Sequence, residues 1–477
     1  MFLWRLPAIR CYTTSIRPQT IYALSSSPGK AGVAVIRISG QHAKECITNM
    51  TLPAGSKSMT DPRQAYFRRI RHPFSGEVLD RGLVLWFPGP HSFTGEDSVE
   101  LQIHGGNAVV KSVLDALHAM PHFRMAEQGE FARRAFDNDK LDLTELEGLA
   151  DLLNAETEVQ RRLALRQAEG GLRIPYEQWR TQIIECMATT EAVIDFGEDE
   201  NIEEGVMDGV IEQVKRLHAS ISSHLDDHRV GEMVRNGIQV AIVGPPNAGK
   251  SSLLNRLAKR EAAIVSNIPG TTRDVVEVKL NLGGYPVIVC DTAGLRESND
   301  LVELEGIRRA RQRIESSDIK ICLISLENGM ALNPVVKDVI DKDTYVILNK
   351  QDVISDQTRL DTLIATLKKD TGAKKIWSMS CETGEGVSLF LDQMIDILKT
   401  KYDDSVANPV LITQVRHREH LEDCIACLDN FLNMPEDEIV LSAEELRQAA
   451  NALGRITGRI DVENVLDVLF GQFCIGK

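Results

Sequence analysis

The chain has 477 residues, of which 43% are hydrophobic, and carries a formal net charge of −15 at pH 7. This length suits about three domains with cores of their own. No apolar run approaches the ~20 residues of a membrane-spanning helix, so we expect no membrane span. The negative charge opposes non-specific binding to nucleic acid, so a role on RNA would need a local basic surface or a basic partner. Nine cysteines without framework spacing indicate free thiols in a reducing compartment.

Residues 1–18 have the composition of a mitochondrial transit segment. Arg5, Arg10 and Arg17 stand among apolar and hydroxyl residues, and no acidic residue appears before Glu45. The alternative is an ordinary disordered tail. The first interpretation predicts a protein of the mitochondrial matrix.

Residues 19–139 have an α+β pattern. The segments 32–38, 82–87 and 99–103 predict strands, and apolar residues at helical spacing from Val109 to Leu117 predict a helix. Arg37, Glu100 and Lys140 are the charged residues of interest in this part of the chain, although by themselves they would be structural or solvated charges.

Residues 140–233 have helical periodicity. Leu146, Leu149 and Leu153 predict one helix that continues to Gly170-Gly171. Two further helices are predicted around 179–194 and 206–225.

The stretch Gly244-Pro-Pro-Asn-Ala-Gly-Lys-Ser251 has the spacing of a P-loop between a short apolar strand and a helix. Its glycines let main-chain N–H groups wrap a phosphate chain, and the helix N-terminus faces the same anion. Lys250 would neutralise β/γ-phosphate charge, and the Ser251 hydroxyl would bind Mg²⁺.

Three later motifs follow strand-like runs within residues 234–402, which we interpret as one doubly wound G domain. Asp291-Thr-Ala-Gly294 can hold the metal. The carboxylate in Asn349-Lys-Gln-Asp352 can accept two hydrogen bonds from guanine, which predicts GTP rather than ATP. Ser380-Cys381-Glu382 predicts the loop that closes over the base. The nucleotide contacts predicted from these motifs are Asn247, Ala248, Gly249, Lys250, Ser251, Ser252, Asp291, Gly294, Asn349, Lys350, Asp352, Ser380 and Cys381.

Two residues distinguish this domain from Ras-like proteins. Leu295 stands where a glutamine would orient the attacking water, so another group must do so. Asn247 places an amide oxygen beside the phosphates, and such an oxygen suits a large monovalent cation better than Mg²⁺. The alternative role for Asn247 is to stabilise the turn.

Residues 403–477 return to helical spacing. Apolar stripes predict helices around 421–432 and 462–469, and Ser442-Ala-Glu-Glu445 predicts a capping box that opens a third helix. The G domain is therefore predicted to be inserted into one discontinuous helical domain. His420, Cys424 and Cys427 could share a face and bind zinc, but without a second cysteine pair core packing is the favoured interpretation.

The motifs together resemble a known family. Pro246-Asn-Ala-Gly-Lys-Ser, Ile268-Pro-Gly-Thr-Thr-Arg-Asp274, Asp291-Thr-Ala-Gly-Leu295 and the C-terminal Cys474-Ile-Gly-Lys477 are similar to the tRNA-modifying GTPases MnmE (TrmE), in their mitochondrial form. The likeness extends from about Ile21 to Lys477.

This resemblance implies hydrolysis that depends on K⁺, with two G domains meeting side by side in a homodimer. Asn247, Ser266, Ile268 and Thr271 would hold K⁺, and Ser251 and Thr272 would hold Mg²⁺. The resemblance thereby adds Ser266, Thr271 and Thr272 to the nucleotide contacts. Glu303 would orient the water, so that Glu303, Asn247, Lys250 and Thr272 are the catalytic residues that the family implies.

The resemblance also implies that residues 19–139 bind a tetrahydrofolate derivative of the 5-formyl or methylene type and dimerise. Arg37, Glu100, Lys140 and Lys477 would contact the folate, and Cys474 could be a reactive thiol. With an FAD-containing GidA (MnmG)-like partner, such a protein would modify C5 of the wobble uridine of mitochondrial tRNAs, with a carboxymethylaminomethyl or taurinomethyl group.

Two other functions compete with this one. An Era-like GTPase of mitochondrial ribosome assembly would carry a basic RNA-binding module after the G domain. A regulatory switch would signal through effectors and would have no use for folate.

Overall fold

The computed structural model describes residues 19–51, 61–196, 205–245, 247–259, 277–291, 315–327, 340–354, 357–407, 411–435, 438–460, 463–473 and 475–476. The chain divides into two compact units, one formed by residues 1–146 with 461–477 and the other by residues 147–460. The domain boundaries expected from the sequence stay predictions.

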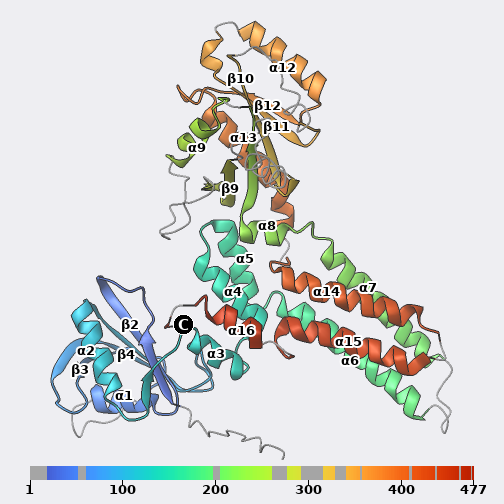
Figure 1. Ribbon diagram of the computed structural model, residues 1–477. Helices are drawn as coiled ribbons and strands as arrows, with labels where there is room; N and C mark the ends of the chain where they lie inside the picture. The colour runs from blue at the N-terminus through green and yellow to red at the C-terminus, as the bar shows by residue number, and fades with distance from the viewer. Residues whose placement is uncertain are drawn as a thin grey trace, which may run out of the picture. The chain divides into compact units, whose positions relative to one another are not determined.

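The first unit is built on a six-stranded sheet with the strand order β3-β4-β5-β2-β1-β6 (Figure 1). Neighbouring strands are antiparallel except for β1 and β6. Its strands are β1 (Thr20–Leu24), β2 (Ala31–Ser39), β3 (Tyr66–Arg71), β4 (Val78–Phe87), β5 (Ser98–Gly105) and β6 (Phe123–Met125). Its helices are α1 (Ala43–Met50), α2 (Asn107–His118), α3 (Glu130–Asp137) and α16 (Glu463–Phe470). The strands predicted at 32–38, 82–87 and 99–103 and the helix after them are confirmed.

The two faces of this sheet differ because side chains alternate along each strand. Ile36, Ile38 and Leu101 are fully buried in the core that also contains residues of α1 and α2. Arg37 and Glu100 are paired across β2 and β5, and they point to the other face. That face carries a small apolar cluster of Ile21, Ala23, Ala126 and Phe131.

The C-terminal segment belongs to this first unit. Phe470 and Phe473 are buried, and the amide of Gln128 donates to the main-chain oxygens of Gly471 and Phe473 at 2.9 and 2.8 Å. Ser25 Oγ donates to the main-chain oxygen of Gly476 at 2.7 Å. Gly476 therefore lies beside the last residues of β1.

The second unit contains a helical part in which elements before and after the G domain share one core. Helices α6 (Arg173–Phe196), α7 (Val206–Leu225), α14 (Val415–Asn433) and α15 (Ile439–Thr457) contribute to this core, and they run side by side in Figure 1. Cys424 is buried in it. The insertion of the G domain between two helical segments is therefore visible in the packing.

Two helix predictions were wrong. The helix expected to continue to Gly170 is two helices, α4 (Leu143–Asn154) and α5 (Glu158–Ala168), because Thr157 forms a capping box with Gln160 and starts a new helix. Ser442 does not open a helix. Helix α15 begins at Ile439, and the Ser442 hydroxyl bonds back to the oxygen of Glu438 at 3.4 Å.

The G domain forms the other six-stranded sheet, in the order β12-β11-β10-β7-β9-β8. All neighbours are parallel except β8 and β9. Its strands are β7 (Ile238–Val243), β8 (Glu277–Leu282), β9 (Tyr285–Asp291), β10 (Ile319–Ser325), β11 (Thr344–Asn349) and β12 (Lys375–Ser378). Its other elements are α8 (Val230–Asn236), α9 (Lys250–Ala258), η1 (Gln351–Val353), α12 (Gln357–Thr371) and α13 (Val387–Ala407).

Within the described residues, no helix combines the length and apolar character needed to cross a bilayer. The same residues contain no group of three or more His, Cys, Asp and Glu side chains placed to hold a metal ion.

Candidate functional site

The predicted nucleotide motifs meet at one edge of the G-domain sheet. Strands β7, β9 and β11 are parallel members of it, and they end at Val243, Asp291 and Asn349. The carboxyl ends of parallel strands lie at the same edge, which is where open α/β sheets bind ligands. Four of the predicted segments are therefore brought together, since β12 ends just before Ser380.

The phosphate loop has a backbone that only small or turn-forming residues accept. Gly249 has φ +99, and a Cβ there would lie 2.1 Å from Nδ2 of Asn349. A Cβ at Gly244 would lie 2.2 Å from the oxygen of Leu323. Asn247 has φ +60, a left-handed conformation that asparagine tolerates better than most residues. The backbone by itself accounts for an asparagine here, and its contact with K⁺ stays a prediction.

Lys250 begins helix α9 and folds back over the loop. Its Nζ donates to the oxygens of Gly244 and Pro245 at 2.8 and 3.1 Å, and the side chain is buried. Ser251 and Ser252 lie exposed in the first turn of the same helix. A cation and a helix N-terminus therefore flank one loop of main-chain N–H groups, an arrangement that suits a polyphosphate.

Asn349 joins the phosphate loop to the predicted base loop. It is 1% exposed at the end of β11. Its Nδ2 donates to the oxygen of Ala248 at 2.8 Å, and its Oδ1 accepts from the N–H of Cys381 at 3.0 Å. The motif asparagine thus has a structural task that the sequence alone did not indicate.

Lys350 and Asp352 follow Asn349 at the same edge. Lys350 has φ +65, and its Nζ forms an ion pair with Glu327. Asp352 lies exposed in η1. An exposed carboxylate beside the base loop is free to meet the donors on the Watson–Crick edge of guanine.

Several predicted residues lie outside the described part of the chain. These are Ser266, Ile268, Thr271, Thr272, Gly294, Glu303, Cys474 and Lys477, together with the predicted transit segment. Asp291 is placed by its backbone, opposite Ile242 of β7.

Three of the four residues expected to contact folate, Arg37, Glu100 and Lys140, lie around one loop of the first unit, and the fourth, Lys477, lies outside the described residues. Arg37 donates from Nε and Nη2 to Oε1 of Glu100, both at 3.1 Å. The guanidinium lies over the rings of Phe93 and Phe131, at 5.3 and 5.9 Å from their centroids. In the same loop as Phe93, a Cβ at Gly95 would lie 3.3 Å from Cγ of Lys140. The loop therefore packs against both Arg37 and Lys140.

Comparison with known proteins decides the family. A family described as "MnmE helical domain" matches residues 143–474, and one described as "GTP-binding protein TrmE N-terminus" matches residues 20–140. The mitochondrial 5-taurinomethyluridine-tRNA synthase subunit GTPB3 of Danio rerio is 47% identical, over 96% of this chain and 93% of that protein. The chain belongs to the MnmE (TrmE) family of tRNA-modification GTPases.

A bacterial relative supports the same assignment. The tRNA modification GTPase MnmE of Parvibaculum lavamentivorans is 48% identical, over 96% of this chain and all of that protein (100%). The solved structure of Era from Aquifex aeolicus is 28% identical over 33% of this chain and 56% of that chain. Its TM-score of 0.29 is too low to indicate anything further.

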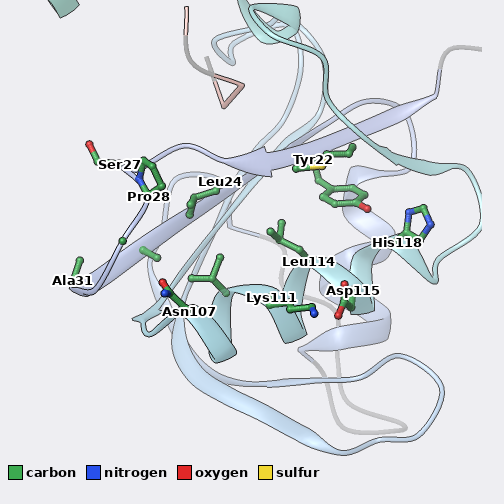
Figure 2. A pocket seen from close by; sticks show the side chains of 14 residues that line it. Tyr22, Leu24, Ser27, Pro28, Ala31, Asn107, Lys111, Leu114, Asp115 and His118 are labelled. Atoms are coloured by element: carbon green, nitrogen blue, oxygen red, sulfur yellow. The ribbon is translucent and has the colours of Figure 1, made fainter. Parts of the chain in front are cut away.

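The MnmE-family chain has a further cavity of about 540 Å³ in its first unit, on the sheet face opposite Arg37. Figure 2 shows Tyr22 and Leu24 of β1 on one side of it, and Lys111 and Asp115 of α2 on the other. Arg37, Glu100 and Lys140, the described residues expected to contact folate, do not line this cavity.

Sequence reasoning missed three residues of this MnmE-family chain that hold candidate sites together. Gln128 holds the C-terminal segment, Glu327 pairs with Lys350, and Arg256 binds the base loop. Each contacts a partner at least 23 residues away in sequence, so no local motif predicts the contact.

Proposed function

We propose that the chain is a K⁺-dependent GTPase that modifies C5 of the wobble uridine of mitochondrial tRNAs, together with an FAD-containing MnmG-like partner. The observation that carries the proposal is the bridge that Asn349 makes between the phosphate loop and the base loop. This bridge holds the phosphate loop and the predicted base loop together at one edge of the sheet, which supports binding of a guanine nucleotide there.

The side-chain oxygens of the phosphate loop and of the first turn of α9 suit the proposed ions as ligands. The Ser251 hydroxyl lies at the helix N-terminus, where an oxygen ligand for Mg²⁺ is expected. Asn247 is exposed, and its amide oxygen suits K⁺. Ser266, Ile268, Thr271 and Thr272 would complete the two ion sites, and Glu303 would orient the water in place of a glutamine.

The first unit is proposed to bind a tetrahydrofolate derivative of the 5-formyl or methylene type. The Glu100 carboxylate can accept from the amino-pyrimidine donors of a pterin, and Phe93 and Phe131 offer aromatic faces beside it. Arg37 and Lys140 would hold anionic or carbonyl oxygens. Bound folate would supply the one-carbon unit of the modification.

The C-terminal segment supports this placement. Gly476 is bonded to Ser25 of the β1 end, and Ala23 of β1 is paired with Arg37 of β2. Lys477 and Cys474 are therefore proposed to act at the folate, with Cys474 as a reactive thiol.

The names of the relatives narrow the product. The relatives of Danio rerio and Homo sapiens are both called mitochondrial 5-taurinomethyluridine-tRNA synthase subunits. These names support a mitochondrial location. We propose that the chain acts in the mitochondrial matrix and that it contributes to a taurinomethyl group rather than a carboxymethylaminomethyl group. The described segments after the G domain are helical, which speaks against an Era-like RNA-binding module.

Nucleoside mass spectrometry of mitochondrial tRNA tests the proposal. Cells that lack the protein should lose the C5 group, and the wild-type chain should restore it. Lys250→Ala and Glu100→Gln should each fail to restore it, whereas Glu422→Gln, a change at an exposed residue of α14, should succeed. Wobble uridines that stay modified in the deleted cells would contradict the proposal.

A further inference from the structure

Arg256 connects the helix that follows the phosphate loop to the predicted base loop, residues 380–385. It lies on α9, which begins at Lys250. Its Nε donates to the oxygen of Cys381 at 2.7 Å, and its Nη2 donates to the oxygen of Glu382 at 2.6 Å. Two adjacent carbonyls of the base loop are thus bound by one planar guanidinium.

The base loop is otherwise held by contacts of its own and by Asn349. The N–H of Gly384 bonds to the oxygen of Ser380 at 2.9 Å, and the N–H of Ser380 bonds to the oxygen of Glu385 at 3.0 Å. Asn349 accepts from the N–H of Cys381. The loop is therefore a compact turn that Asn349 holds through an N–H and Arg256 holds through two oxygens.

The fit between Arg256 and the loop is close. Gly384 has φ +92, and a Cβ there would lie 2.5 Å from Nη1 of Arg256. The guanidinium consequently lies against the turn as well as bonding to it. A lysine ammonium could reach one of the carbonyls but could not reproduce the planar pair of bonds.

We propose that Arg256 is a positioning residue that sets the base loop at the correct distance from the phosphate loop and thereby raises the affinity for the guanine O6 edge. The proposal rests on the assignment of residues 380–382 to the base. Guanine O6 is an acceptor that a main-chain N–H of this loop would meet, whereas the Asp352 carboxylate would accept from N1 and the 2-amino group. A nucleotide has a fixed length between phosphate and base, so the two loops must keep a fixed separation. Arg256 and Lys250 share one helix, which makes this separation rigid.

A set of ligands separates positioning from general damage. GDP carries O6, the N1 proton and the 2-amino group, and IDP lacks only the 2-amino group. The diphosphate of 2-aminopurine riboside lacks O6 and, with it, the N1 proton that Asp352 would accept, so each ligand is compared with itself between wild type and variant. Their affinities are measured by calorimetry on the full chain, on Arg256→Gln and on Arg256→Lys. Because all three are measured on the same protein, their ratios do not depend on the fraction that is folded.

Arg256→Gln should lower the affinity for GDP and for IDP by the same factor, about fivefold to tenfold, which is the effect of losing one well-placed hydrogen bond. The affinity for the ligand without O6 should fall by less than about twofold. The affinities of Arg256→Lys for GDP and IDP should lie between those of the wild type and of Arg256→Gln. Lys259→Gln removes an exposed positive charge from the same end of α9 and should change none of the three affinities.

Two results would overturn the proposal. One is an equal loss for all three ligands in Arg256→Gln, and the other is no loss at all. A wild-type chain that binds GDP no better than the ligand without O6 would instead show that residues 380–382 do not meet the base, and this would remove the underlying assignment.

Discussion

The side-chain nitrogen of Asn349 lies 2.8 Å from the main-chain oxygen of Ala248. Ala248 lies in the phosphate loop and Asn349 ends β11, so the bond fixes the spacing between the phosphate loop and the motif that follows β11. The same side chain also bonds to the N–H of Cys381. Three loops of the nucleotide site therefore depend on one buried amide.

Replacing Asn349 with alanine should loosen this site. The change leaves a buried oxygen of Ala248 and a buried N–H of Cys381 unpaired, which costs about 1–3 kcal/mol for each group that stays unsatisfied. We expect GDP to dissociate at least about tenfold faster, as measured by the release of a fluorescent GDP analogue. Asn255→Ala, a change at an exposed residue of α9, is the control. Equal release rates for wild type and Asn349→Ala would contradict this role of Asn349.

Gly249→Ala should abolish nucleotide binding. Its φ of +99 is unfavourable for alanine, and the added Cβ would lie 2.1 Å from Nδ2 of Asn349. Gly209→Ala is the matched control, because Gly209 lies inside α7 with nothing within 4 Å of its Cβ. That control should bind GDP normally and stabilise its helix by about 0.5–1 kcal/mol. Retained GDP binding by Gly249→Ala would show that the loop is not built as described.

Gln128→Ala should release the C-terminal segment from the first unit. It removes the two hydrogen bonds to the oxygens of Gly471 and Phe473. We expect weaker binding of 5-formyl-tetrahydrofolate in equilibrium dialysis, with unchanged GTP turnover because the G domain is untouched. Glu127→Gln, at the exposed neighbouring residue, should leave both properties intact. Full folate affinity in Gln128→Ala would mean that the segment does not contribute to that site.

His224 should make the helical part of the chain less stable in acid. Burial lowers its pKa to about 4, with Asp227 opposing and His417 and Arg418 adding to the shift. The unfolded chain takes up this proton near pH 6.5, so the free energy of unfolding falls as the pH drops from about 6.5 to about 4, by up to about 3 kcal/mol. The loss is complete below that range.

His224→Gln should remove this part of the pH dependence, because glutamine keeps an acceptor for the Tyr176 hydroxyl but does not titrate. The fluorescence of Trp179, whose ring centroid lies 5.4 Å from that of His224, can follow unfolding of this region. If the free energy of unfolding had the same pH dependence in the wild type and in the variant, His224 would not be the group responsible.

The parts of the site that could be predicted from the sequence are those in which the local backbone or a local run of apolar residues requires each residue type. The P-loop glycines are required by backbone conformation, and the strands before Asp291 and Asn349 are runs of apolar residues. The break between α4 and α5 was missed although its signal was present, since Thr157 and Gln160 have the spacing of a capping box. Ser442 has that spacing too, but it lies within a helix that had already begun.

The remaining contacts could not be predicted because they join distant segments. Arg256 meets Cys381 across 125 residues, and Gln128 meets Gly471 across 343. A single arginine or glutamine in the sequence belongs to no periodic pattern that could identify a partner so far along the chain. Only the folded chain shows which oxygen each of them reaches.

The proposed GTP hydrolysis depends most on a potassium ion beside Asn247 that takes the place of an arginine. GTP turnover by the wild-type chain and by Asn247→Ala should be compared in KCl and in NaCl at equal ionic strength. We expect the wild type to be at least about tenfold faster in KCl, the factor that ~1.4 kcal/mol of transition-state stabilisation gives, and the variant to be slow in both salts. Equal rates for the wild type in the two salts, or a variant as fast as the wild type, would contradict the claim.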